Sequence, residues 1–545
     1  MNKEETIDIL SGLLRYESVK DNSNYYVDVP IEDLMDDDGI CSYRYTVMED
    51  GDIQVEKRKN SNICGSPVKR SLRQIIWKIC KLNQVCSLYK KNYEKWKEEN
   101  SDIPYIETII NDDSDGMPEQ AFEFMRNFWS EEAVNGSDYH RNLRLLLAEY
   151  GIGKTSYCNG IRYLVAEEIE APFLNSNAAF PFVFDLNEFR SGDFDKFIET
   201  ELFGKYNIPL VYHVFERLCQ QGIFMVVLDA WDQMRGARQI YPINQDLNQM
   251  SSLWTNKGRT LITCRRSFYQ QQLKGVGKQK LSQNVGLYKL NGFDKTSVKA
   301  YLQKDAQKRR LNGILPLIED ECKWVDNCWD LNSELLAKPL NLRLLVMHFN
   351  AISSQIDFYK EKADTYVFLE IVLNDWKEKN HIGDDLFLKE LISQTLFSGL
   401  NRSISMNQFK ESVVSDNWDS IIAALNAFDF IKIDERRERI EFCLAAFQEF
   451  LWAHFVLNEL KKAPEKLDNE NSLLKNYLLI REVREWICKV LGREKSECLA
   501  NHISCTKYKN KEDAGFRGAN ALTLLCDLNH KVIFDYLFKS SYMPV

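Results

Sequence analysis

The chain has 545 residues, of which 44% are apolar and 12% aromatic, and its formal net charge is −10. This length exceeds what one hydrophobic core accommodates, so we expect three or four domains, and the apolar content excludes a generally disordered chain. Charges of both signs are spread along the sequence and the amino terminus has no signal-peptide pattern, so we expect a cytoplasmic protein with neither a nucleic-acid nor a membrane partner.

The first 125 residues predict a small α+β segment of unknown role. Strand-like stretches lie near Tyr43–Val47 and Ile53–Glu56, and helical patterning runs from Ser71 to Glu99. YYVDVPIEDL, residues 25–34, has the character of an extended arm. NDDSDGMPE, residues 111–119, is rich in turn formers and predicts a linker before an amphipathic helix.

From Asn142 onward, short continuous apolar runs alternate with helical stretches. The runs are LRLLLAEY, FPFVFDLN, IFMVVLDAW, RTLITCR and VGLYKL. Continuous apolar strands separated by helices are typical of a parallel sheet covered on both faces. We therefore expect an α/β domain with a five-stranded parallel sheet over residues 126–290.

The rest of the chain is mostly helical in pattern. Asp294 is placed to cap a helix that begins KTSVKAYLQK, and residues 430–442 predict a small hairpin before a strongly apolar helix. Fourteen cysteines without a CxxC pair indicate reduced thiols. Cys498, His502 and Cys505 resemble a zinc site only weakly, and buried thiols on amphipathic helices explain them more simply.

AEYGIGKTS, residues 148–156, follows the first apolar run. In the consensus GxxxxGK[ST], backbone N–H groups wrap phosphates, the lysine reaches the outer phosphates and the hydroxyl ligates magnesium. An ordinary strand-to-helix turn is the alternative, but the flanking strand and helix favour a nucleotide-binding loop, with Ala148 in place of the first glycine. Its expected nucleotide-binding residues are Ala148, Gly151, Gly153, Lys154, Thr155 and Ser156.

Two further strand ends carry polar residues that fit nucleotide chemistry. Asp229 ends the run MVVLD, where a carboxylate can hold magnesium, and Asp232 is placed to orient or deprotonate an attacking water. Arg265 ends LITCR and is a candidate sensor of the γ-phosphate, with a surface salt bridge as the alternative. We expect the strand neighbouring the loop strand to bring Asp229 beside the loop, so that Thr155 and Asp229 share the metal.

With these motifs in order, the chain resembles the NACHT group of STAND-class P-loop NTPases, which are bacterial NLR-like switches. The resemblance covers residues 126–460 and also rests on FPFVFDLNEF, LNGFDKTSVKAYL, LAKPLNLRLL and FCLAAFQEFLWA. It implies a NACHT domain at 126–290, a small helical domain at 291–365, a winged-helix domain at 366–460 and a C-terminal helical domain at 461–545. By position, it also implies that Pro339 lies against the base and ribose, although a proline that only begins a helix is unremarkable.

Three positions depart from the family pattern. Ala148 stands where the family often has glycine. Gln233 follows Asp232 where the family usually has glutamate, which removes one carboxylate and predicts slow hydrolysis. Leu444 occupies the place of a winged-helix histidine that reaches the ADP phosphate, and an apolar side chain cannot donate that hydrogen bond.

The resemblance implies an ATP/ADP-controlled, Mg²⁺-dependent switch of bacterial antiphage innate immunity, which opens and self-associates when an unknown trigger, such as a phage component, is recognised. GFRGANALTLLCDL, residues 515–528, is similar to the helix that introduces pentapeptide-repeat sensors in some bacterial NACHT proteins. The repeats themselves are missing, so we expect a short form or a fragment. Two alternatives remain open: a scaffold that holds nucleotide without turning it over, and a winged-helix transcriptional regulator.

Overall fold

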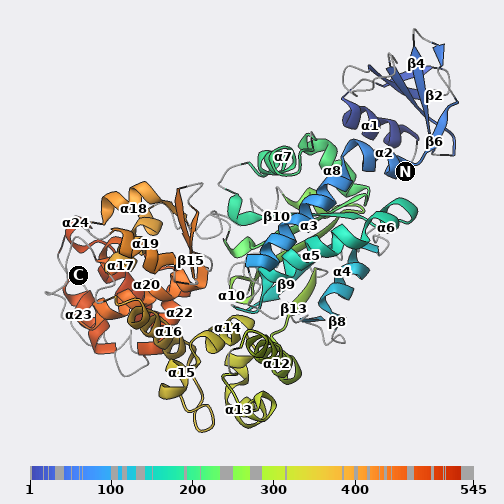
Figure 1. The fold of residues 1–545 in the computed structure, drawn as a ribbon. Coiled ribbons are helices and arrows are strands. Elements are labelled where there is room, and N and C mark those ends of the chain that lie inside the picture. Colours follow the sequence, from blue (N-terminus) through green and yellow to red (C-terminus); the bar gives the residue numbers. More distant parts are fainter. Residues whose placement is uncertain are drawn as a thin grey trace. The chain divides into compact units, whose positions relative to one another are not determined.

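The computed structural model divides the chain into two compact units, residues 1–343 and 344–545 (Figure 1). The structure describes all residues except 1–2, 16–17, 22–23, 31–41, 51, 60–61, 64–65, 100–107, 113–118, 131–141, 150, 190–192, 209, 234–249, 270–284, 314–315, 383–385, 398–402, 414–417, 427, 429, 435–437, 443–444, 463–471, 492–495, 507–508, 510 and 529–545.

The chain begins with a helix packed on an antiparallel sheet. Helix α1 (Lys3–Leu14) packs on the second and third strands of this sheet, and Leu10, Val27, Val47 and Ile53 are all buried in the core. The strands are β1 (Val19–Asp21), β2 (Asn24–Pro30), β3 (Ser42–Val47), β4 (Ile53–Lys59), β5 (Asn62–Ile63) and β6 (Val68–Arg70). The two strands predicted here are confirmed as β3 and β4. The expected extended arm is in part β2, which pairs with β3, and residues 31–34 of that arm lie outside the described part.

A seven-stranded sheet forms the centre of the first unit, in the order β10-β11-β12-β9-β13-β7-β8. The strands are β7 (Ile109–Asp112), β8 (Glu119–Gln120), β9 (Leu143–Ala148), β10 (Phe180–Asp185), β11 (Phe224–Asp229), β12 (Arg259–Arg265) and β13 (Gly286–Leu290). All pairings among β9 to β13 are parallel, which confirms the expected α/β class and five parallel strands.

Two antiparallel strands from the N-terminal region extend this sheet. Strand β7 pairs with β13, and β8 pairs with β7. The sequence interpretation places both strands before the boundary at residue 125, outside the NTPase domain. They are too short to show strand periodicity, and only the pairing of β7 with β13 and of β8 with β7 reveals them.

Helices cover both faces of the sheet and its outer edge. They are α2 (Leu72–Ile79), α3 (Leu82–Glu99), α4 (Ala121–Ser130), α5 (Lys154–Glu168), α6 (Glu170–Asn175), α7 (Phe194–Gly204) and α8 (Tyr212–Gln220). The single helix expected over residues 71–99 is broken at Lys81, whose φ is 49°. Helix α3 lies along α5 (Figure 1), where Tyr93 stacks on Tyr163 at 4.4 Å between ring centroids.

The outer edge of β10 is closed by two tyrosine hydroxyls. Alternate residues of an edge strand point their backbone groups away from the sheet, so these groups need other partners when buried. The Val183 N–H donates to Tyr89 Oη at 3.0 Å, and Tyr206 Oη donates to the Val183 carbonyl at 2.6 Å. Pro181, which also faces outward, has no N–H to satisfy. Helix α3 thus completes the edge of the core sheet.

Residues 291–343 follow the sheet as a helical segment. It contains α12 (Lys295–Leu311), α13 (Glu321–Leu336) and the start of α14 (Pro339–Met347). Asp294 caps α12 by accepting a hydrogen bond from the Ser297 N–H at 2.7 Å, as predicted. The Phe293 N–H donates to the Ala337 carbonyl at 2.7 Å, which fixes the start of α12 against the end of α13.

The second unit contains a helix-strand-helix-helix-hairpin arrangement typical of a winged helix. Its elements are α17 (Leu386–Phe397), β14 (Ser403–Ser405), α18 (Met406–Ser412), α19 (Trp418–Asn426), β15 (Ile431–Asp434) and β16 (Arg439–Phe442). Strand β16 lies between β14 and β15, and the predicted hairpin is confirmed as β15 and β16. The flanking helices are α15 (Phe349–Gln355), α16 (Thr365–Lys379) and α20 (Ala445–Leu460).

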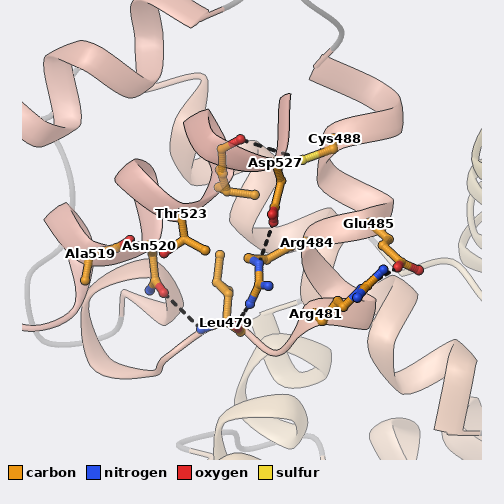
Figure 2. A network of polar contacts seen from close by, with 10 residues as sticks. Leu479, Arg481, Arg484, Glu485, Cys488, Ala519, Asn520, Thr523 and Asp527 are labelled. Atoms are coloured by element: carbon orange, nitrogen blue, oxygen red, sulfur yellow. Dashed lines mark hydrogen bonds and ion pairs between the residues drawn. The ribbon is translucent and has the colours of Figure 1, made fainter. Parts of the chain in front are cut away.

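The last described helices are held by polar contacts, some of them buried (Figure 2). They are α21 (Leu473–Asn476), α22 (Arg481–Leu491), α23 (Ser496–Ser504), α24 (Lys511–Ala514) and α25 (Arg517–Leu528). Asn520 accepts from the Leu479 N–H at 2.9 Å and donates to the Leu474 and Tyr477 carbonyls. Arg484 joins α22 to α25 through Asp527 at 2.7 Å. No group of metal-ligating side chains occurs among the described residues, so the weak zinc resemblance near Cys498 is not supported.

Candidate functional site

The loop after β9 has the backbone of a phosphate cradle. Ala148 is the last residue of β9, and it is buried and paired with Arg265 of β12. Because this position is regular strand, an alanine fits where the consensus has glycine. Strand β9 lies between β12 and β13, so its loop sits where the chain connections diverge to the two sides of the sheet. In open α/β sheets this point at the carboxyl ends of the strands is the usual ligand site.

The two glycines adopt left-handed conformations. Gly151 has a φ of 77° and Gly153 a φ of 104°, and Gly153 is the N-cap of α5. A Cβ on Gly153 would lie 3.9 Å from its nearest neighbour, so the backbone angle rather than space requires glycine there. This turn directs the chain into the first turn of α5.

Lys154, Thr155 and Ser156 form that first turn. Their N–H groups have no partner within the helix, and the N-cap residue Gly153 supplies no side-chain cap. The Lys154 ammonium donates to the Ala148 carbonyl at 3.5 Å, so it lies over the loop that it is predicted to serve. Thr155 is exposed, which leaves it accessible to a metal ion.

Asp229 is buried at the carboxyl end of β11. Thr263 Oγ1 donates to Asp229 Oδ1 at 2.6 Å and accepts from the Ala230 N–H at 3.0 Å. Ala230 has a φ of 63°, which is costly for a residue with a Cβ, so Thr263 fixes both the carboxylate and the turn behind it. Sequence reasoning missed Thr263, although it lies two residues before Arg265 on the same strand.

The charge of Asp229 depends on its neighbours. Burial raises the pKa of this carboxyl, and the charge of Asp185 raises it further. Hydrogen bonds from Thr263 and Cys158 and the charge of Arg162 oppose that rise. Asp185 ends β10 directly opposite Asp229, and sequence reasoning did not single it out, although it is an acid at the end of a buried strand like Asp229.

Asp229 reaches the loop region by a different route from the one expected. Strand β12 separates β11 from β9, so the acid is not on the strand that neighbours the loop strand. Its thiol partner Cys158 belongs to α5, three residues after Thr155. Helix α5 therefore connects the acid to the cradle.

Asp232 and Arg265 form an ion pair. The Arg265 N–H donates to Asp232 Oδ1 at 3.0 Å, and Arg265 Nε lies 2.9 Å from Asp232 Oδ2. The two side chains are 2% and 11% exposed for Asp232 and Arg265 respectively, so the salt bridge weighed for Arg265 exists but is buried. Among the described residues Oδ2 makes no hydrogen bond, so its contact with Nε is electrostatic.

The segment around Pro339 contacts the loop. The Leu340 N–H donates to the Gly151 carbonyl at 3.3 Å, and a Cβ on Gly151 would lie 3.4 Å from the Leu340 Cβ. Pro339 is the first residue of α14, which satisfies the helix-start interpretation. Its contact with a base and ribose stays a prediction. Leu444 and the Gln233 side chain lie outside the described part.

These residues fit a nucleotide with Mg²⁺. The uncapped N–H groups at the start of α5 and the Lys154 ammonium suit phosphate oxygens, because helix N-termini attract anions. Thr155 and Asp229 supply the oxygen ligands that Mg²⁺ prefers. A divalent cation would also offset the repulsion between Asp185 and Asp229.

Comparisons with known proteins give distant likenesses. No family model matches the chain, and no curated protein matches it. A Walker-type ATPase of Pyrococcus abyssi shares 14% identity over 58% of this chain and 95% of that chain, with a TM-score of 0.27. Cdc6p from Pyrobaculum aerophilum shares 14% identity over 59% of this chain and 88% of that chain, with a TM-score of 0.28. The Aeropyrum pernix ORC1 protein, in a complex with DNA, shares 13% identity over 60% of this chain and 88% of that chain, with a TM-score of 0.26.

The strand order and the cradle of this chain by themselves give residues 143–290 a P-loop NTPase fold. The domain boundaries inside each unit stay predictions. Among the described helices, none combines the length and apolar character needed to cross a membrane.

Proposed function

We propose that the first unit binds ATP or ADP with Mg²⁺ and that the bound nucleotide controls a signal-transduction switch. The observation that carries this proposal is the left-handed Gly153, which turns β9 into α5 and leaves three uncapped N–H groups under Lys154. A plain strand-to-helix turn needs neither the lysine nor a strand-end acid beside the same helix.

Each predicted site residue has a proposed role. Lys154 and the N–H groups from Gly151 to Ser156 hold the phosphates, and Thr155 and Asp229 hold Mg²⁺, which neutralises phosphate charge. Asp232 orients the attacking water, Arg265 contacts the γ-phosphate and Pro339 packs against the base and ribose. Because Gln233 leaves Asp232 without a neighbouring carboxylate, hydrolysis is slow and serves to reset the switch.

The resemblance to bacterial NACHT proteins supports a finer proposal. In it, the segments 291–365, 366–460 and 461–545 close over ADP in the resting state, and exchange for ATP opens the protein in the cytoplasm. Opening exposes a surface through which copies self-associate in an innate-immune response to a phage-derived trigger. A nucleotide biases such an equilibrium only by its different affinity for the two states.

The nucleotide retained by the purified protein tests this proposal. We expect wild-type protein to retain ADP or ATP, and Lys154→Ala and Asp229→Ala to lose it. Lys196→Ala is a matched control, since Lys196 lies on α7 with its side chain 80% exposed. Equal nucleotide content in wild type and Lys154→Ala would contradict the proposal. Measured turnover then separates the switch from a scaffold that never hydrolyses ATP.

A winged-helix transcriptional regulator is a second candidate, favoured by the arrangement of α17 to β16. Its third helix, α19, corresponds to the helix that enters the major groove in helix-turn-helix proteins. The sequence of α19, WDSIIAALN, has one acid and no lysine or arginine, which disfavours phosphate or base contacts. The initial expectation against nucleic acid gains no support from the comparisons. Salt-dependent duplex binding by the intact chain would favour the regulator.

A further inference from the structure

The Asp232–Arg265 ion pair lies next to the phosphate cradle. Arg265 is the register partner of Ala148, whose carbonyl accepts the hydrogen bond from Lys154. The thiol of Cys264, the residue before Arg265, is influenced by the charges of Asp232 and Lys154. Burial raises the pKa of this thiol, Asp232 raises it further and Lys154 lowers it. The ion pair and Lys154 therefore lie near the same end of β12.

The pair joins Asp232 to Arg265 in two separable ways. One contact comes from the Arg265 backbone, whose N–H donates to Oδ1, and it persists wherever the side chain points. The other is the electrostatic contact of Nε with Oδ2 at 2.9 Å. Because the guanidinium is buried against the Asp232 carboxylate, another anion has to compete with Asp232 for it.

We propose that Asp232 is a specificity-determining residue, which competes with the γ-phosphate for Arg265 and thereby sets the preference between nucleoside di- and triphosphate. This inference rests on the proposed function. ADP leaves the pair intact, because it offers no third phosphate, whereas ATP draws the guanidinium away from Oδ2.

The same change of partner by Arg265 determines when Asp232 can act on water. While Arg265 neutralises Oδ2, that oxygen cannot accept a proton or a hydrogen bond from water effectively. Once the guanidinium moves to the γ-phosphate, Oδ1 keeps its backbone hydrogen bond and Oδ2 becomes the free acceptor. Asp232 is then held in place by Arg265 N–H and is available to water only when a triphosphate is present.

Binding of ADP and of a non-hydrolysable β,γ-imido analogue of ATP, measured by calorimetry, tests this competition. Asp232→Asn keeps an acceptor for the Arg265 N–H but removes the charge, so the affinity ratio of analogue to ADP rises at least about fivefold. Arg265→Gln lowers the ratio below that of wild type. Asp305→Asn, which breaks the partly buried pair of Asp305 with Arg309 on α12, is the control and leaves the ratio unchanged.

The double variant separates competition from simple removal of negative charge. If Asp232 acts through Arg265, Asp232→Asn adds nothing to the ratio in the Arg265→Gln background. An equal rise in both backgrounds, or an unchanged ratio in Asp232→Asn, would overturn the inference while leaving nucleotide binding intact. If Asp232→Asn does not fold, an unchanged ratio in Arg265→Gln alone overturns it. Wild-type protein that binds neither nucleotide would instead overturn the proposed function.

Discussion

Replacing Tyr89 by phenylalanine is expected to leave the Val183 amide, on the edge of the core sheet, without its hydrogen-bond partner. The replacement also removes two longer contacts of the hydroxyl, at 3.4 Å, to the Pro181 carbonyl and Tyr206 Oη. The Val183 N–H donates to Tyr89 Oη at 3.0 Å, and both residues are buried. Burial raises the pKa of Tyr89 well above its usual value, so its hydroxyl stays protonated. Phenylalanine keeps the ring packing and removes only the oxygen.

The expected cost follows from one unsatisfied buried donor, about 1–3 kcal/mol. The Val183 amide loses its hydrogen bond, so it should exchange with solvent roughly 5- to 150-fold faster, the factor that corresponds to about 1–3 kcal/mol. Residue-resolved hydrogen exchange measures this directly. The neighbouring amide of Phe184 is an internal control, since alternate residues of a parallel strand face opposite sides and Phe184 points toward β11.

Tyr206→Phe provides the complementary test. It removes the 2.6 Å donor to the Val183 carbonyl but leaves the N–H of Val183 bonded to Tyr89. Exchange at Val183 should change less than in Tyr89→Phe, although global stability falls in both variants. Equal acceleration at Phe184 and Val183 in Tyr89→Phe would refute the edge-capping interpretation, as would no acceleration at either.

Three other predictions test separate parts of the chain. Gly153→Ala should cost about 1–2 kcal/mol and abolish nucleotide retention, measured by thermal unfolding and by the nucleotide content of purified protein, because alanine disfavours a φ of 104°. Asn520→Ala should destabilise the second unit in denaturant unfolding by about 2–3 kcal/mol, because it leaves a buried N–H and two carbonyls without their hydrogen-bond partner. Thr523→Ala removes a hydroxyl on the exposed face of α25 and should change the free energy of unfolding little. Burial alone would raise the pKa of Asp375, but Lys379 and His348 outweigh burial and lower this pKa from 3.8. The stability that Asp375 contributes is therefore present above pH 3.8 and is lost below it as the pH falls. Asp375→Asn should thus be less stable than wild type at pH 7 in urea unfolding, with the difference vanishing in acid.

The sequence predicts the phosphate loop well because its signals are local. A continuous apolar run specifies β9, the glycines specify the positive φ angles, and the uncapped start of α5 follows from Gly153. The N-cap at Asp294 is predicted for the same reason, since a cap depends on residues within one turn. Such features need no knowledge of distant contacts.

Features that depend on pairing across the fold are not predictable in this way. Strand β7 pairs with β13, which lies far along the chain, and β8 in turn pairs with β7. Thr263 gains its role only because β12 is inserted between β9 and β11, and no periodicity in the sequence reveals that order. Arg265 is predicted as a γ-phosphate sensor with a salt bridge as the alternative, and the sequence does not reveal that Asp232, just after the preceding strand β11, is an ion-pair partner.

The N-terminal region is joined to the nucleotide site through helix α5. The first turn of α5 forms the cradle, Cys158 in its second turn contacts Asp229, and Tyr163 farther along stacks on Tyr93 of α3. The same α3 supplies Tyr89 to the edge of β10. A chain that began at residue 126 would lack this cover and strand β7, leaving the Val183 amide and the outer edge of β13 without their partners. The described residues 72–99, 109–112 and 119–120 therefore belong physically to the NTPase core. Residues 3–70 have a sheet of their own, and α1 joins that sheet to the core by packing on α8, where Asp8 pairs with Arg217.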